Sequence, residues 1–373
     1  MEGEFMNGYE NKTKILITSV PPEAKGGILS IHQVLFGKPL QENIELDFFR
    51  VASPNPFNER LANRLTRIII RIIQFSHQLI KDKSIKVIHI NTAYDLRSLM
   101  RDALFIVISR ILRKKIVLQI HQRIEPSHNK IIDFITKHVF PLCNKILVFS
   151  QESKKILATL VPEGKIELFP NPVVVDDFKM GDKSYKNELN IPKEGKIVLF
   201  LSRLIKEKGV YDLIESIPEI IQRNENVYFV FAGEGPDRIQ MENTCKMKGI
   251  EKQVRFTGHI PYKDVIRAFS SADIFVLPTY FPEGMPMAIL QALAAGLPII
   301  STPISSIPDI VTDGINGFLV EPHASDQLTE KISLLISKKE LRNRMGEDNI
   351  KLARKEYDLD IVLKKLELLY LSI

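Results

Sequence analysis

The sequence predicts an α/β protein of two doubly wound domains in tandem. Short apolar runs typical of buried parallel strands alternate with helical patterns, and this alternation occurs twice along the chain. The length of 373 residues exceeds that of a single typical core and fits two α/β domains. Hydrophobic residues make up 45% and charged residues 26%, so we expect a folded chain with little disorder.

The first half begins with an apolar strand at 14–20. A Pro/Gly turn follows, which contains Gly26 and Gly27, and then a helix that starts at Ile28. Further strands are expected at 44–51, 87–90, 116–120, 146–149 and 166–169. We assign residues 1–175 to an N-terminal domain and give residues 1–12 no structural role.

A polar stretch at 176–194 is predicted to be the linker, after which the alternation restarts. Strands are expected at 197–201, 227–232, 254–257, 274–277 and 297–301. We assign residues 176–360 to a C-terminal domain, and we expect the helix in 361–373 to pack back on the first domain. Two such sheets predict a ligand-binding cleft between the carboxyl ends of their strands.

The net charge of +6 is unevenly distributed. Residues 1–175 hold 25 Lys and Arg against 16 Asp and Glu, a balance of +9, which leaves 26 against 29, or −3, in the rest. A basic half fits an anionic partner such as a membrane surface, a lipid phosphate or a nucleic acid. A nucleic acid is the weakest of these, because no basic motif with interleaved aromatic residues occurs.

Residues 59–83 repeat Leu, Ile and Phe at helical spacing among Arg and Lys, which predicts a basic amphipathic helix. Such a helix can lie on an anionic membrane surface, or it can be an ordinary core helix with a solvated cationic face. No apolar run reaches the ~18 residues of a membrane span, and the acidic start is unlike a secretion signal. We therefore expect a cytoplasmic protein, peripheral on the inner face of the membrane if the helix binds lipid. Cys143 and Cys245 are interpreted as reduced, buried thiols.

The densest chemical signal lies between a predicted strand and the helix 288–295. It is the run Pro278-Thr279-Tyr280-Phe281-Pro282-Glu283-Gly284-Met285-Pro286-Met287. Gly284 allows a tight turn or a close approach to a ligand, and Pro286 suits the first helical position. Free N–H groups at the helix start then favour an anion. A carboxylate beside a bound phosphate is unfavourable unless it accepts from a ligand hydroxyl, so Glu283 indicates a sugar. The alternative is that Glu283 only complements the helix dipole.

A second signal follows the strand at 197–201. Arg203 and Lys208 are five residues apart on one loop and can converge on a diphosphate, the Arg through its planar fork and the Lys as a point charge. A solvated basic loop is the alternative. His121 ends another strand, and its position favours contact with a bound sugar over a structural role. His89 also ends a strand and is interpreted as structural, while Asp309 and Glu321 are interpreted as caps or surface charges.

These segments resemble family 4 of the retaining glycosyltransferases, also called group 1, whose GT-B architecture has two facing Rossmann-like domains. The resemblance spans nearly the whole chain and is more specific in the second half. It rests on Ser202-Arg203-Leu204 with Lys208-Gly209, Gly233-Glu234-Gly235-Pro236, Val254-Arg255-Phe256-Thr257-Gly258, the Glu283 run, Ala295-Gly296-Leu297-Pro298, and Gly314-Ile315-Asn316-Gly317-Phe318. In the first half it rests on Gly26-Gly27, His121 and Asn171-Pro172-Val173.

The resemblance implies a role for each matching residue. Arg203 and Lys208 would bind the donor diphosphate and stabilise its departure, and Glu283 would accept from sugar hydroxyls. Backbone groups of Gly284, Met285, Pro286 and Met287 would touch sugar and phosphate, Gly258 would lie by the base, and Gly26 and Gly27 by the phosphates or the acceptor. His121 would lie by the reacting centre on the acceptor side. The family's second glutamate, eight residues after the first, is Gln291 here, so any ribose contact lacks its charge.

The expected function is transfer of a hexose from a nucleotide-diphosphate sugar to a glycan or lipid-linked acceptor, in cell-surface polysaccharide biosynthesis. UDP is expected as the commonest donor nucleotide of the family. No cofactor or metal is expected: the only D-x-D match, Asp358-Leu359-Asp360, begins the terminal helix. The resemblance favours front-face transfer, since no carboxylate is placed as a nucleophile. A sugar-nucleotide epimerase or hydrolase of the same fold, or a non-catalytic nucleotide-sugar binder, are the alternatives.

Overall fold

The computed structural model describes residues 12–19, 44–51, 61–126, 129–178 and 185–373, with the single positions 35 and 40. The chain divides into two compact units: unit 1 holds residues 1–169 and 363–373, and unit 2 holds residues 170–362. The domain boundary that we predicted after residue 175 therefore lies inside unit 2. Gly26, Gly27 and the helix expected from Ile28 lie outside the described residues.

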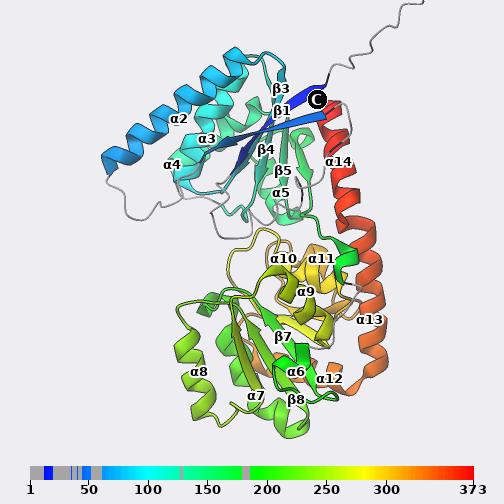
Figure 1. The fold of residues 1–373 in the computed structure, drawn as a ribbon. Helices are drawn as coiled ribbons and strands as arrows, with labels where there is room; N and C mark the ends of the chain where they lie inside the picture. The colour runs from blue at the N-terminus through cyan, green and yellow to red at the C-terminus, as the bar shows by residue number, and fades with distance from the viewer. Residues whose placement is uncertain are drawn as a thin grey trace, which may run out of the picture. The chain divides into compact units, whose positions relative to one another are not determined.

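Unit 1 is built on a six-stranded sheet in the order β2-β1-β3-β4-β5-β6, all of whose described pairs are parallel (Figure 1). The strands are β1 (Thr13–Ser19), β2 (Ile44–Arg50), β3 (Ile85–Thr92), β4 (Lys115–Ile120), β5 (Lys145–Val148) and β6 (Ile166–Leu168). Helices α2 (Leu61–Lys81), α3 (Leu96–Ile111), α4 (Lys130–His138), α5 (Gln151–Ala158) and the single turns η1 (Phe140–Leu142) and η2 (Glu163–Lys165) connect them.

Side chains of unit 1 alternate between the two faces of the sheet. On β3, Ile88 and Ile90 point into a buried cluster that also holds the three aromatic rings of Phe49, Phe75 and Phe105. His89 lies between those two isoleucines in sequence and contacts Tyr370 of α14 (Leu359–Ser372). The period of two thus separates an apolar face under α2 and α3 from a face that the end of the chain covers.

Unit 2 holds a second six-stranded parallel sheet, in the order β12-β11-β10-β7-β8-β9 (Figure 1). Its strands are β7 (Lys196–Leu201), β8 (Val227–Ala232), β9 (Val254–Gly258), β10 (Ile274–Leu277), β11 (Ile299–Ser301) and β12 (Gly317–Leu319). The last of these was not predicted, because its three residues follow a Gly- and Asn-containing turn and form no apolar run. The two sheets confirm the predicted α/β class.

The helices of unit 2 follow its strands in turn. They are α7 (Val210–Arg223), α8 (Arg238–Met247), α9 (Tyr262–Ser271), α10 (Met287–Ala294), α11 (Ile307–Ile310), α12 (Ser325–Ser337) and α13 (Lys339–Leu352), with η4 (Lys206–Lys208) before α7 and η5 (Ala353–Tyr357) after α13. The polar stretch that we predicted as a linker holds η3 (Val175–Phe178) and α6 (Tyr185–Glu188). Glu188 of α6 pairs with Arg267 of α9, so α6 packs within unit 2.

Both cysteines are buried free thiols. Burial raises the pKa of Cys143 to about 12 and that of Cys245 to about 11, so neither is a reactive thiolate near neutral pH. None of the described helices is both long and apolar enough to cross a membrane.

Gly233 fits a place where the backbone of unit 2 is closely packed. Its φ of +139° lies in a region that favours glycine, and a Cβ there would come within 2.0 Å of the Ser202 carbonyl oxygen. Gly249 has a positive φ of +67° as well, but a Cβ on it would meet no atom within 4 Å. The two glycines therefore differ both in backbone conformation and in the close approach of another atom.

We expect Gly233→Ala to lower the free energy of unfolding by about 3 kcal/mol, because backbone strain and a clash with a carbonyl add. The comparison change Gly249→Ala should cost only about 1 kcal/mol, since its φ of +67° is a milder left-handed conformation and no atom lies within 4 Å of the added Cβ. Urea denaturation followed by circular dichroism measures both. Equal losses for the two variants would show that the close approach of Gly233 to Ser202 does not matter.

Candidate functional site

The strand order of unit 2 reverses between β7 and β10. From β7 the sheet grows through β8 to β9 on one side, and the chain then returns to place β10, β11 and β12 on the other. At such a reversal the loops after the two central strands diverge and leave a crevice at the carboxyl edge of the sheet. The loop after β7 carries Arg203 and Lys208, and the loop after β10 carries Glu283. The strand order therefore brings the Arg203 and Lys208 loop and the Glu283 loop, which carry the two strongest motifs of the sequence, to the same edge of the sheet.

Lys208 and Glu283 form an ion pair across this reversal. Their side chains are only 10% and 14% exposed, so the pair is largely removed from water. The Lys208 ammonium also lies 4.5 Å from the centroid of the Phe281 ring, which adds a cation–π contact. A buried cation and a buried carboxylate thus neutralise each other within the described residues.

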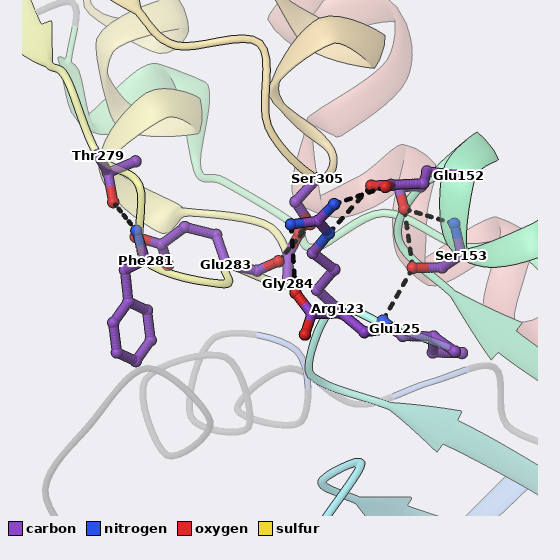
Figure 2. Close-up of polar contacts among 11 residues, drawn as sticks. Arg123, Glu125, Glu152, Ser153, Thr279, Phe281, Glu283, Gly284 and Ser305 are labelled. Carbon is purple, nitrogen blue, oxygen red and sulfur yellow. Dashed lines mark hydrogen bonds and ion pairs between the residues drawn. The ribbon is translucent and has the colours of Figure 1, made fainter. Parts of the chain in front are cut away.

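Backbone hydrogen bonds hold the loop after β10 against the loop after β7. The carbonyl of Glu207 accepts from the N–H groups of Tyr280 and Phe281, both at 2.9 Å, and the Thr279 hydroxyl accepts from the Phe281 N–H at 3.1 Å. The Ser305 hydroxyl donates to the Glu283 carbonyl, as Figure 2 shows. These bonds fix the backbone from which the Glu283 side chain extends, although Glu283 lies on a loop.

Helix α10 starts directly after this loop, at Met287. We predicted Pro286 at the first helical position, but it is the N-cap residue, one position earlier, and no side chain caps the helix. Gly284 does not adopt a positive φ, so a tight left-handed turn is not the reason for this glycine. The Met285 carbonyl accepts from the Asn171 side-chain amide at 3.2 Å.

The remaining predicted residues of unit 2 lie on or near the same edge. Arg203 is exposed and makes no ion pair with any residue of the described chain. Gly258 ends β9 with a φ of +72°, a left-handed conformation that favours glycine. Gln291 lies half-buried on α10.

In unit 1, a chain of hydrogen bonds links residues at the carboxyl ends of β1, β3 and β4. Asn91 of β3 donates through Nδ2 to the Thr18 carbonyl of β1 at 2.9 Å, so its Oδ1 faces the Nε2 of His121 after β4, at 2.7 Å. An Oδ1 atom only accepts, and a neutral His121 therefore carries its proton on Nε2. The Phe149 ring packs against the imidazole with centroids 5.6 Å apart. Asn91 thus orients the histidine that the sequence singled out.

His89 differs from His121 in a way that supports its structural interpretation. It is fully buried, with Nδ1 2.5 Å from the Tyr370 hydroxyl and Nε2 3.1 Å from Gln119 Oε1. Beyond β4, Arg123 holds Glu152 of α5 through two hydrogen bonds of 3.1 and 2.6 Å, and the Ile124 N–H donates to Ser153 (Figure 2). This second arrangement fixes the course of the chain after His121.

The sequence did not indicate several residues that shape these sites. Asn91 and Thr18 lie inside apolar strands, and Ser305 follows a strand without a recognisable motif. Asn171 was singled out only as part of the run Asn171-Pro172-Val173, which resembles the family. Its Oδ1 is buried and has no hydrogen-bond partner among the described residues. No group of three or more His, Cys, Asp or Glu side chains in the described ranges is placed to hold a metal ion.

Two family models match adjoining parts of the chain. The model described as glycosyl transferases group 1 matches residues 182–352, and the model described as glycosyltransferase family 4 matches residues 34–177. The second half of the chain, with Arg203, Lys208 and Glu283, falls in the first of these, and His121 in the other.

Curated relatives are similar over part of their length. An alpha-D-kanosaminyltransferase of Streptomyces kanamyceticus is 28% identical, over 48% of this chain and 46% of the relative. A D-inositol 3-phosphate glycosyltransferase of Corynebacterium glutamicum is 30% identical, over 45% of this chain and 42% of the relative. The matched region spans about half the length of such relatives.

Solved structures match the fold over nearly the full chain. The Anabaena protein HepE, solved with UDP-glucose, superposes with a TM-score of 0.77 at 18% identity, covering 96% of this chain and 100% of that one. A glycosyltransferase of Rickettsia africae gives 0.79 at 17% identity, covering 96% and 98%. At this identity the likeness concerns the fold, and it confirms the predicted GT-B class of two Rossmann-like domains.

We expect Glu283→Gln to lower the free energy of unfolding by about 3 kcal/mol, because it leaves the Lys208 charge buried without its partner. The double variant Lys208→Met with Glu283→Gln should recover most of that loss, since the unpaired charge is gone. Urea denaturation of both variants makes the comparison. Additive losses in the double variant would mean that the ion pair is not coupled in solution.

Proposed function

Because the chain belongs to the group 1 glycosyltransferases, we propose that it is a retaining hexosyltransferase that takes its sugar from a UDP-sugar. The observation that carries the proposal is the Lys208–Glu283 pair at the reversal of strand order, directly before the uncapped helix α10. UDP is supported by the UDP-glucose complex of the structurally similar HepE. The acceptor would be a glycan or a lipid-linked glycan, in the synthesis of a cell-surface polysaccharide.

We assign each part of the unit 2 site a role in binding the donor. Without a donor, Lys208 and Glu283 satisfy each other. With a donor, Lys208, Arg203 and the first N–H groups of α10 would neutralise the diphosphate, and Glu283 would accept hydrogen bonds from sugar hydroxyls. Fixed charges and dipoles of this kind stabilise a leaving diphosphate as its charge develops. Gln291 would approach the ribose through its amide.

On the acceptor side we assign a positioning role to Asn91 and a direct contact with the substrate to His121. The hydrogen bond from Nε2 to Asn91 fixes the ring and its tautomer. With the proton held on Nε2, the ring would act as a hydrogen-bond partner for the transferred sugar. We further propose front-face transfer, in which the departing phosphate takes the proton of the acceptor hydroxyl.

We also propose that unit 1 docks on an anionic membrane through α2. This helix is apolar on two sides: Phe75 and Leu79 are buried in the core, while Ile69, Ile73 and Ile80 are 57%, 61% and 60% exposed. The three exposed isoleucines share one face at helical spacing. Exposed apolar rows next to basic side chains are typical of helices that lie in the lipid interface.

The donor site is tested by Arg203→Ala, because the exposed Arg203 side chain contributes no described ion pair to the fold. We expect kcat/KM for UDP-sugar turnover to fall about 100-fold, since one cation of the diphosphate site is lost. Released UDP is measured with and without acceptor, which separates transfer from hydrolysis. The control Lys206→Ala changes an exposed cation on the same loop and should leave turnover unchanged. Equal activity of Arg203→Ala and wild type would contradict the proposed site.

The base of the donor is identified by a thermal-shift screen of UDP-, GDP- and ADP-sugars, since a ligand that binds the folded state raises Tm. We then expect metal-independent turnover of the donor found, because Arg203, Lys208 and the start of α10 would supply the positive charge. The UDP release rate should be the same before and after dialysis against EDTA, with no gain on adding Mg²⁺ or Mn²⁺. A rate that falls on dialysis and returns with metal would sink this part of the proposal.

Membrane docking predicts that the protein floats with phosphatidylglycerol vesicles at low salt, and that Ile69→Gln with Ile73→Gln reduces the floating fraction severalfold. The matched control is Ile239→Gln in α8 of unit 2, an isoleucine that is 73% exposed. No flotation of the wild type at low salt would end the idea, and equal loss in the control would show that the effect is not specific to α2.

A further inference from the structure

The amino edge of the unit 1 sheet holds a pocket of about 430 Å³, the size of a small-molecule site. Five basic side chains line it: Lys83, Lys86, Arg113, Lys114 and Lys115. They come from the segment between α2 and β3 (Lys83), from the start of β3 (Lys86), from the segment that joins α3 to β4 (Arg113 and Lys114) and from the start of β4 (Lys115). None of the described residues that line the pocket has an Asp or Glu side chain, and Ile373, the last residue of the sequence, is one of them.

The acidic residues of the same region offset the positive charge of this pocket only in part: the charge of Asp82 opposes the effect of burial on the pKa of Lys114. Asp82, next to Lys83, is paired with Lys14 at 2.9 Å. Hydrogen bonds from Ser84 and from Lys14 lower the pKa of Asp82 to about 2. Within the described chain, Lys86, Arg113 and Lys115 have no ion pair. Several like charges around one hollow repel each other, and a bound anion would relieve that repulsion.

Lys114 is the innermost of the five cations. Its ammonium donates to the Ile85 carbonyl at 2.5 Å, and burial lowers its pKa. An ammonium has three N–H donors, and only one is used by this bond. An anion in the pocket would accept from the other two and stabilise the charged form.

Arg113 occupies a backbone position where glycine is the usual residue. It follows α3 with a φ of +55°, and the hydrogen bonds from the Arg113 N–H to Arg110 and from the Lys114 N–H to Ser109 form a Schellman motif. An arginine in this left-handed conformation is less stable than a glycine. Because Arg113 lines the pocket although its backbone conformation is unfavourable for an arginine, its side chain indicates a role other than stabilising the fold.

The pocket is separate from the transfer site of the same unit. His121 and Asn91 lie at the carboxyl ends of β4 and β3, whereas Lys115 and Lys86 lie at their amino ends. A strand of this length separates the two edges by roughly 20 Å. A ligand in the pocket therefore does not contact His121.

We propose that this pocket is a second anion site, which binds a phosphate ester or polyphosphate through the fork of Arg113 and the ammonium groups of the four lysines. Arginine suits bidentate contact with phosphate oxygens, and lysines supply charge without fixed geometry. Two sources share this chemistry: a soluble phosphorylated molecule and the phosphomonoester headgroup of a lipid.

Tripolyphosphate is the probe for the shared chemistry, with saturating UDP present to fill the donor site of unit 2. Tripolyphosphate should raise the Tm of the wild type, and the effect should weaken as salt is added. Lys86→Glu with Lys115→Glu changes two exposed side chains and should weaken binding at least about tenfold, with UDP-sugar turnover unchanged. The charge-matched control Lys155→Glu lies on α5, away from the pocket, and should bind as the wild type does.

Arg113→Gly gives a result that a purely structural role would not produce. It should raise the Tm of the free protein, because glycine suits the left-handed position, while it weakens tripolyphosphate binding about tenfold. The control Asn190→Gly changes another exposed residue at positive φ, 51°, in unit 2, and should leave binding unchanged. Wild-type affinity in both Arg113→Gly and the double lysine variant would overturn the proposal.

The two sources are separated with phosphatidylcholine vesicles that contain or lack phosphatidic acid. Binding that needs phosphatidic acid and is lost in the double lysine variant identifies the lipid headgroup. Loss of tripolyphosphate binding with unchanged vesicle binding identifies a soluble ligand. If the wild type binds neither tripolyphosphate nor phosphatidic acid, the pocket is not an anion site.

Discussion

Lys208 and Glu283 can meet only because β7 and β10 are neighbours, although two strands and three helices separate them in sequence. The reversal of strand order sends one loop to each side of the crevice, and the ion pair spans it. The features around the pair serve to keep the two loops in register. Hydrogen bonds to the Glu207 carbonyl and from Ser305 fix the loop that bears the carboxylate. The geometry of the proposed donor site therefore depends on sheet topology as much as on the residues themselves.

The same logic applies to unit 1 with different chemistry. Its strand order reverses between β1 and β3, and the Asn91 to Thr18 hydrogen bonds join the carboxyl ends of these two strands. His121 takes its orientation from that link, while a cluster of buried isoleucines and phenylalanines supports the strands from below. A neutral, hydrogen-bonded edge of this kind suits recognition of sugar hydroxyls, which offer donors and acceptors but no charge.

The excess of basic residues in the first half of the chain lies in two places, which we interpret differently. Part of it belongs to α2, where the outward face carries isoleucines that an ordinary surface helix would not expose. Another part gathers at the amino edge of the sheet, around a pocket. Net charge alone could not separate the two, because it reports how many cations a segment holds and not which of them share a surface.

The class of fold and eleven of the twelve strands, to within a few residues, could be predicted from the amino-acid sequence, and the candidate residues Lys208 and Glu283 could be assigned to the loops after two of those strands. Apolar runs and glycine-rich loops are local signals, and they can be read without knowing what lies beside them. Strand β12 was not predicted, because its three residues carry no pattern.

Which of these residues lie next to one another could be seen only in the folded chain. The pairing of Lys208 with Glu283, the alignment of Asn91 with His121 and the gathering of Lys86, Arg113 and Lys115 around one pocket each join positions that are far apart in sequence or unremarkable within it. Their proximity follows from strand order and register, which arise from the packing of the whole sheet and not from any one segment.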